Sequence, residues 1–159
     1  QWGPSAGEAG CSLMKALTPY LNFPGTTEEA FTFYADALGG TIMGVARFRD
    51  FGDEMGSLPA EDLDKVANIG LLLPNGSMMM GTDMLASMGQ EFASGNDFSL
   101  HVEADSVEEA QRIFNALAEG GTVSMEPAPT AWAEWFAGCT DRFGVEWMVS
   151  YTGSVVSGG

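Results

Sequence analysis

Two stretches of the sequence decide the fold: residues 27–41, TEEAFTFYADALGGT, and residues 107–122, VEEAQRIFNALAEGGT. Both begin with Glu-Glu-Ala, carry an aromatic residue on the same helical face and end in Gly-Gly-Thr. The offset is 80 residues at the start (108 − 28) and 81 at the end (120 − 39), which predicts one residue inserted within the second helix. Two copies are too few for a solenoid, which needs at least about three stacked repeats. They predict a duplicated module, with any ligand site between the two halves.

Each copy carries the signals of a helix with defined ends. Thr26 and Ser106 both precede a Glu by three residues, which predicts a capping box at each helix start. The pairs Gly39-Gly40 and Gly120-Gly121 are expected to end the helices in the left-handed conformation. No strand-to-helix turn follows these glycines, so they do not indicate a phosphate-binding loop.

Period-two patterns surround both helices and predict strands. The turn Pro74-Asn75-Gly76 predicts a hairpin between two of them. Residues 50–64 and 84–96 are acidic or rich in Gly and Ser, and we expect loops there. The predicted strands cover residues 17–23, 41–48, 67–73 and 77–82 in the first half, and 97–104, 122–125, 135–140 and 145–151 in the second. Each half therefore reads as strand, helix and three strands.

The chain of 159 residues is long enough for one core built from two such halves. The organisation predicts a flexible leader over residues 1–16 and a flexible tail over residues 152–159. Between them we expect a first module over 17–83, a linker over 84–96 and a second module over 97–151.

Charge and cysteine content restrict partners and compartment. The net charge of −16 comes from 22 acidic and 6 basic residues, which argues against nucleic acid as a partner. The excess either serves solubility or attracts a cationic ligand. No apolar run is long enough to span a bilayer, and the first residues lack the apolar core of a secretory signal. Cys11 and Cys139 show no pairing or metal spacing, and we expect Cys139 to be buried in a cytoplasmic protein.

Several motifs together resemble one superfamily. They are EEAF of the first helix, LTPYLNF at 17–23, MGTD at 80–83, DFSL at 97–100 and DRFGVEWMV at 141–149. This set resembles the vicinal oxygen chelate superfamily of glyoxalases, dioxygenases and bleomycin resistance proteins, and within it the PhnB-like branch. The resemblance implies an α+β fold in which two βαβββ modules form a glyoxalase-like half-barrel sheet, a ligand cup between the modules, and a homodimer. Relatives in this branch are sometimes labelled methyltransferases, but the sequence contains no glycine-rich nucleotide site to support that label.

The same resemblance argues against the metal of the superfamily. Metal-binding relatives place His or Glu at four inward positions. Carried over to this sequence, those positions fall at Pro19 or Tyr20, within 78–80, at Ser99 and at Met148. None of these residues is a usual ligand for a divalent cation. The chain has one His, so a site with two His ligands is excluded and we expect no metal or other cofactor.

His101 and Glu103 share one face of a predicted strand, and Glu146 is expected on a strand nearby. This group is either a replacement metal site, a His–Glu acid–base pair or a polar cavity wall with a hydrogen-bonded His. The aromatic residues Trp132, Trp135 and Phe136 either stack on a flat ligand or seal the core or a dimer contact.

Methionines and arginines leave similar alternatives open. Residues 78–80 are three methionines, which with Met84 and Met88 either line a ligand site or fill the core. Arg47 and Arg49 either bind an anionic group or form surface ion pairs with Asp50 or Asp53.

Three functions remain. The leading one is a metal-free protein that holds a mostly apolar, cationic or aromatic small molecule in the cup. The residues expected to line that cup are Tyr20, Asn68, Met79, His101, Trp132, Glu146 and Met148. The alternatives are a metal-dependent lyase or dioxygenase-like enzyme with a non-standard site, and a dimer module whose cup is vestigial.

Overall fold

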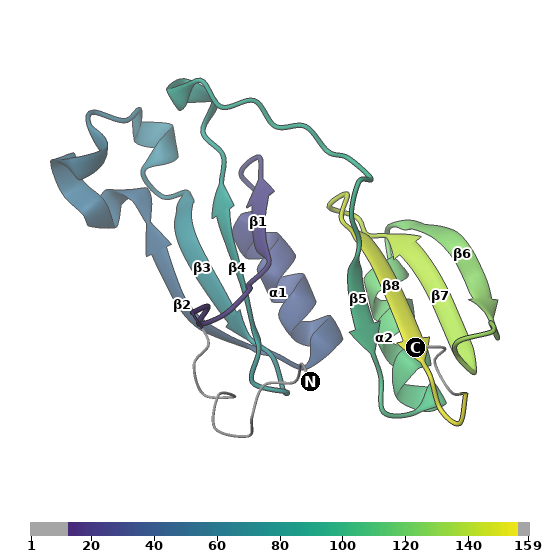
Figure 1. Ribbon diagram of the computed structural model, residues 1–159. Helices are drawn as coiled ribbons and strands as arrows, with labels where there is room; N and C mark the ends of the chain where they lie inside the picture. Colours follow the sequence, from purple (N-terminus) through teal and green to yellow (C-terminus); the bar gives the residue numbers. More distant parts are fainter. Residues whose placement is uncertain (1–12, 156–159) are drawn as a thin grey trace, which may run out of the picture.

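The chain folds into two βαβββ modules that lie side by side (Figure 1), in a computed structural model that describes residues 13–155. Most of the predicted leader and half of the predicted tail lie outside these residues, as does Cys11. The first module comprises β1 (Tyr20–Phe23), α1 (Thr27–Leu38), β2 (Thr41–Arg47), β3 (Val66–Leu72) and β4 (Met78–Asp83). The second comprises β5 (Leu100–Glu103), α2 (Val107–Ala118), β6 (Thr122–Ala128), β7 (Trp135–Thr140) and β8 (Glu146–Tyr151). The predicted α+β fold of two βαβββ modules is confirmed.

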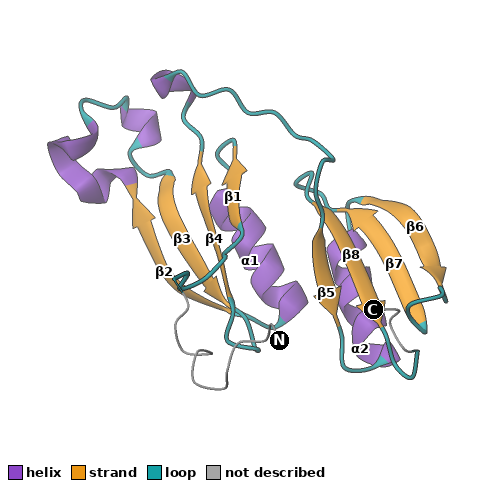
Figure 2. Ribbon diagram, in the orientation of Figure 1, coloured by secondary structure: helices purple, strands orange, loops and turns teal. Residues whose placement is uncertain are grey.

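Each module forms its own four-stranded sheet, with its helix against one face (Figure 2). The strand orders are β1-β4-β3-β2 and β5-β8-β7-β6, with one parallel pair in each sheet, β1 with β4 and β5 with β8. Among the described residues no strand pair joins the two sheets, so the half-barrel consists of two separate sheets. Short 3-10 helices occupy much of the two predicted loops, at Phe48–Met55, Ala60–Asp62 and Ala86–Met88. No helix within residues 13–155 is long and apolar enough to cross a bilayer.

The strand registers show which residues of the two modules are equivalent. Tyr20 lies opposite Met80 in the first module, as His101 lies opposite Met148 in the second. The offset is therefore 81 residues at the first strand (101 − 20) and 68 at the last (148 − 80). Ser99, one of the positions carried over from metal-binding relatives, does not pair with Met148, whose partner in the parallel register is His101.

The helix boundaries correct two further predictions. Both helices have 12 residues, and Glu119 follows α2 as its C-terminal cap, so the inserted residue lies after the helix. Ser106 caps α2 as predicted, accepting a hydrogen bond from the Glu109 amide at 3.1 Å. Thr26 does not cap α1 through its side chain, because its backbone (φ −112°, ψ 14°) is not in the extended conformation that Ser106 adopts.

A buried carboxylate replaces the missing cap of α1. Asp83, at the end of β4, accepts hydrogen bonds from the Thr27 amide at 3.0 Å and from the Thr27 hydroxyl at 2.6 Å. Its second oxygen accepts from the Val66 amide at 2.8 Å. One carboxylate therefore ties the start of α1 to two strands, which a capping residue within the helix cannot do.

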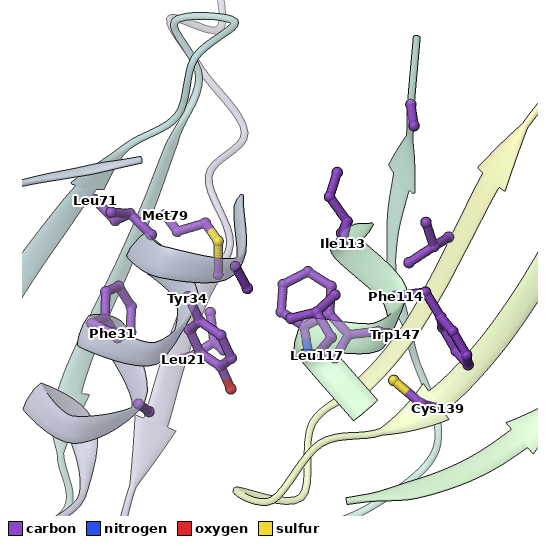
Figure 3. Close-up of a cluster of buried hydrophobic side chains, with 14 of the residues drawn as sticks. Leu21, Phe31, Tyr34, Leu71, Met79, Ile113, Phe114, Leu117, Cys139 and Trp147 are labelled. Carbon is purple, nitrogen blue, oxygen red and sulfur yellow. The ribbon is translucent and has the colours of Figure 1, made fainter. Parts of the chain in front are cut away.

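One hydrophobic core runs through both modules and joins them (Figure 3). Tyr34 of α1 packs against Trp147 of β8 with ring centroids 5.4 Å apart. Both side chains donate to the buried carboxylate of Asp141, from the Tyr34 hydroxyl at 2.6 Å and the Trp147 indole at 2.8 Å. Cys139 is fully buried in the same core, as predicted. The modules are thus fixed by a shared core rather than by strand pairing.

Candidate functional site

Two hollows lie at the junction of the modules, and they occupy equivalent places. The first, which we call the β1 hollow, measures about 400 Å³ and is bounded by β1 and residues 144–146 of the β7–β8 turn. The second, the β5 hollow, measures about 780 Å³ and is bounded by β5 and residues 76–78 of the β3–β4 turn. Because Gly76 and Gly144 close turns with the same hydrogen bonds, the same structural parts build both hollows. The side chains on those parts differ.

Aromatic side chains dominate the β1 hollow. Tyr20, Phe92 and Phe98 line it and are 49%, 40% and 63% exposed. Two carboxylates, Glu91 and Glu146, stand at the same hollow, and no Lys or Arg is among its described lining residues. Flat rings and carboxylates around an open space suit a flat cation, because ring faces and negative charges both attract it.

Polar neighbours hold two of these side chains in place. The Tyr20 hydroxyl donates to Asn68 Oδ1 at 3.3 Å. Asn68 therefore holds Tyr20 in place without lining the hollow itself. Glu146 accepts from the Thr140 hydroxyl at 2.8 Å, which leaves its other oxygen available to a ligand. The third wall is formed by residues 91–95 of the segment between the modules.

The β5 hollow carries the chain's single His. His101 Nε2 lies 2.7 Å from the Ser150 hydroxyl, and that hydroxyl lies 2.6 Å from Glu103 Oε2. Glu103 Oε1 also accepts from the Thr152 amide at 2.7 Å. His101 and Glu103 line the hollow, while Ser150 is buried behind them with 2% exposure.

The electrostatics of the β5 hollow follow from its carboxylates. Burial raises the pKa of Glu103, but hydrogen bonds from Ser150 and Thr152 and the charge of His101 outweigh it, so the pKa lies below its ordinary value. Asp105 and Glu109 also line the hollow, and Glu109 is paired with Arg112 at 2.5 Å. The hollow is therefore negative at neutral pH and unfavourable to anions.

The structure divides the residues predicted to line one cup. Tyr20 and Glu146 line the β1 hollow, and Asn68 contacts Tyr20. The others lie elsewhere: His101 at the β5 hollow, Met148 beside it on β8, Met79 in the helix-side core with an edge on the β5 hollow, and Trp132 on the surface. They therefore do not surround one space, and whether each of them binds a ligand stays a prediction.

Three of these placements have clear physical reasons. Met79 is 3% exposed and pairs with Leu71, so its side chain points towards α1 and fills the core. Met148 is half-buried between His101 and Gly138 on the strands beside it. Trp132 is 52% exposed and packs edge-to-face on Phe136, with ring centroids 5.6 Å apart, so it stays largely in solvent.

The arginine prediction is corrected in its partners. The Arg47 guanidinium pairs with Glu28 at 2.5 Å and donates to the Asp64 carbonyl at 2.8 Å. Arg49 pairs with Asp64 at 2.6 Å. Both arginines form surface ion pairs, which is one of the two predicted alternatives. Their partners are Glu28 on α1 and Asp64 just before β3, rather than Asp50. Asp50 instead accepts a hydrogen bond from the Arg47 backbone amide.

Sequence reasoning missed part of both hollows. Phe92, Phe98 and Glu91 lie in or beside the predicted linker. The composition of that segment predicts a loop and does not indicate that these residues line the β1 hollow. Alternation along residues 145–151 places Ser150 on the same strand face as Glu146, but nothing in the sequence pairs it with His101. Residues 13–155 contain no group of three His, Cys, Asp or Glu side chains placed to hold a metal ion.

Two βαβββ modules, each with its helix against one face of a four-stranded sheet, define the class of fold, which is that of glyoxalase-like proteins. Solved structures titled glyoxylase/bleomycin resistance protein/dioxygenase and fosfomycin resistance protein share this fold with TM-scores of 0.61 and 0.60. Their identities of 12% and 8% make this a likeness of fold alone.

Comparison with nearer relatives gives the family. The chain belongs to the PhnB-like family whose sequence model, described as 3-demethylubiquinone-9 3-methyltransferase, matches residues 15–150. Protein YjdN of Escherichia coli (strain K12) is 31% identical over 144 residues, which cover 84% of this chain and 93% of YjdN. Protein PA1353 from Pseudomonas aeruginosa is 38% identical with a TM-score of 0.74, covering 87% of this chain and 98% of that chain. A PhnB protein from Bacillus cereus is 26% identical with a TM-score of 0.70, covering 86% and 99%.

Proposed function

We propose that this protein binds a small, mostly apolar, cationic aromatic molecule in the β1 hollow, without a metal ion. One observation carries the proposal: three exposed aromatic side chains and two carboxylates surround a space of about 400 Å³. A ring that stacks on Tyr20 or Phe98 gains contact area, and a positive charge on it gains attraction from the ring faces and from Glu146.

The rest of the molecule supports a cationic ligand. With a net charge of −16, the whole chain raises the local concentration of cations near its surface. Drug-sequestering members of the superfamily are the nearest functional analogy, and that analogy rests on fold. The activity printed in the family description is a property of the proteins so named and is not carried over to this chain.

Proflavine, a flat aromatic cation, is a direct probe of the β1 hollow. Titration followed by its fluorescence is expected to show saturable binding to the wild-type protein. The double variant Tyr20→Ala/Glu146→Gln should bind at least about tenfold more weakly, because it loses one stacking surface and one charge. The flat anion 2-naphthoate should bind far more weakly than proflavine to the wild-type protein.

A matched control separates the hollow from the general negative charge. Glu61→Gln removes one exposed carboxylate from the 3-10 helix Ala60–Asp62, which lines neither hollow, and should leave proflavine binding unchanged. Equal losses in the control and in the double variant would contradict the proposal. Elemental analysis of protein purified without chelator checks the metal-free part, which stoichiometric Zn, Ni, Mn or Fe would overturn.

We also propose that the protein acts as a homodimer. Strand β6 forms the outer edge of the second sheet and is exposed along its whole length. Its apolar side chains Val123 and Met125 are 39% and 44% exposed. An unpaired strand edge with apolar side chains can pair with the same edge of a second copy. Sedimentation velocity tests this directly: the wild-type protein should sediment as a dimer and Met125→Lys as a monomer. A wild-type monomer across the accessible concentration range would refute it.

A further inference from the structure

A continuous hydrogen-bonded chain of three side chains lies at the β5 hollow. It runs from His101 Nε2 to the Ser150 hydroxyl at 2.7 Å and from that hydroxyl to Glu103 Oε2 at 2.6 Å. Ser150 is 2% exposed, so water does not compete for its hydroxyl. His101, at the other end, is exposed and is among the residues that line the hollow.

The chain of bonds fixes where the protons are. A carboxylate only accepts hydrogen bonds, so the single hydroxyl proton of Ser150 goes to Glu103. The Ser150 oxygen must then accept from His101, which places a proton on Nε2 of the imidazole. In the neutral ring the lone pair is therefore on Nδ1, and no residue among 13–155 donates to that atom. The result is an oriented base with a free lone pair.

The first module shows that the fold does not need this chain. The equivalent positions hold Tyr20, Thr82 and Asn22, on strands paired in the same parallel register. There the Thr82 hydroxyl bonds to the Val66 and Asp83 carbonyls instead, at 3.3 and 3.4 Å. The same strand pair thus forms with no ionisable pair across it. Strand pairing of this kind therefore does not itself require His, Ser and Glu at these positions, although Glu103 also accepts from the Thr152 amide.

The surroundings select the kind of molecule that could meet the base. Leu17, Leu38 and Leu100 also line the β5 hollow. The carboxylates of Glu103 and Asp105 stand at the same hollow, so an anionic molecule is repelled. A space of about 780 Å³ with these walls suits a neutral, mostly apolar molecule of up to drug size.

We propose that the β5 hollow is a proton-transfer site in which His101 Nδ1 acts as general base towards a neutral apolar substrate with an acidic C–H bond. The substrate proton moves to Nδ1, and the electron pair of the C–H bond stays on the substrate carbon or moves into a new bond. The imidazolium that forms keeps its Nε2 proton on Ser150, whose own proton remains directed at Glu103. His101 is the catalytic residue, and Ser150 and Glu103 position and stabilise it.

The neutral carbon acid 5-nitrobenzisoxazole tests the proposal with no co-reactant. A base removes its ring C–H proton, the C–H electrons form a nitrile bond and the N–O bond breaks to release a coloured phenolate. We expect the wild-type protein to accelerate this reaction over buffer, and His101→Gln to lose about tenfold or more of the protein-dependent rate, within the range for general bases. Ser150→Ala and Glu103→Gln should each lose about threefold to tenfold.

Imidazole ¹⁵N spectra provide a readout that a merely structural role would not change. The chain has one His, so its ring nitrogens are seen without overlap. In alkaline solution the wild-type ring should carry its proton on Nε2, and Ser150→Ala should give a mixture of both tautomers. Thr82→Ala is the matched control at the equivalent position of the first module, and should change neither the rate nor the tautomer.

Each failure is distinguishable. No acceleration over buffer, a wild-type rate in His101→Gln, or a wild-type ring protonated on Nδ1 would each overturn the proton-transfer site. Unchanged tautomer and rate in both Ser150→Ala and Glu103→Gln would overturn their positioning role. None of these results bears on proflavine, which binds in the other hollow.

Discussion

The β3–β4 turn and the β7–β8 turn have the same backbone conformation, but the residue that begins each turn differs in chemical character. In the first module the Leu73 amide donates to Ser77 at 2.8 Å; in the second the Asp141 amide donates to Val145 at 2.9 Å. Gly76 and the equivalent glycine of the second turn have φ values of 90° and 92°. Leu73 is half-buried and apolar, whereas Asp141 is a buried carboxylate.

That one difference decides which turn joins the modules. Asp141 accepts from Tyr34 of the other module and from Trp147, and also from the amides of Phe143 and Val145. Four donors satisfy a carboxylate that no Lys or Arg contacts among the described residues. A duplicated turn can therefore close a hairpin in one copy and connect two modules in the other, with no change of backbone.

The largest expected effect is the removal of this carboxylate. Asp141→Ala leaves two buried and two partly buried donors without an acceptor and should lower the free energy of unfolding by about 3–5 kcal/mol. Leu73→Ala, at the equivalent position, removes only half-buried apolar surface and should cost about 1 kcal/mol. Urea unfolding measures both variants. Equal losses would show that the two turns do not differ in the way the hydrogen bonds indicate.

The stability of the protein at alkaline pH should depend on the same contact between Tyr34 and Asp141. Burial, then the charge of Asp141 and its hydrogen bond, raise the pKa of Tyr34 far above its ordinary value. Between the ordinary pKa of about 10 and the raised one, the folded state keeps a proton that the unfolded state loses, so stability falls by about 1.4 kcal/mol per pH unit. Burial also raises the pKa of the Cys139 thiol to about 11, so a decline should already begin near pH 9.

The variant Tyr34→Phe separates the two contributions. It lacks the phenol, so its loss of stability above about pH 10 should be shallower than that of the wild-type protein, and the decline that begins near pH 9 should remain. Urea unfolding at a series of pH values provides the slopes. Parallel curves for the two proteins would contradict a buried, protonated Tyr34.

The smallest expected effect compares the two helix starts. Ser106→Ala removes a side-chain cap and should cost about 1 kcal/mol. Thr26→Ala should cost close to nothing, because Asp83 takes the capping role through Thr27. Thermal unfolding resolves a difference of this size. A loss in Thr26→Ala equal to that in Ser106→Ala would restore the symmetric capping that the sequence predicts.

The sequence predicted what depends on local pattern. Helix repeats, strand periodicity and the Pro74-Asn75-Gly76 turn lie within a few residues of each other, so they were sufficient to predict both modules. The failures involve distant partners. Thr26 fulfils the capping pattern, but Asp83 lies 56 residues from Thr27 and cannot be inferred from the pattern at the helix start.

The candidate site was less predictable for a similar reason. Alternation along a strand assigns a face but not a register, so Ser99 and His101 are equivalent until the pairing with Met148 is known. Three successive methionines, Met78 to Met80, carry no alternation at all, so the sequence could not show that Met79 packs in the core on the helix side. The aromatic wall of the β1 hollow comes from Phe92 and Phe98, on a segment whose composition indicates only a connection.

The separation of the two sheets has a consequence for the order of folding. Every strand pair closes within its own half of the chain, so each half can form its hydrogen-bonded ladders without waiting for the other. The bond from Tyr34 to Asp141 spans 107 residues and requires both halves to be present. Because closing so long a loop costs entropy, we expect this contact to form late, so that its loss speeds unfolding more than it slows folding.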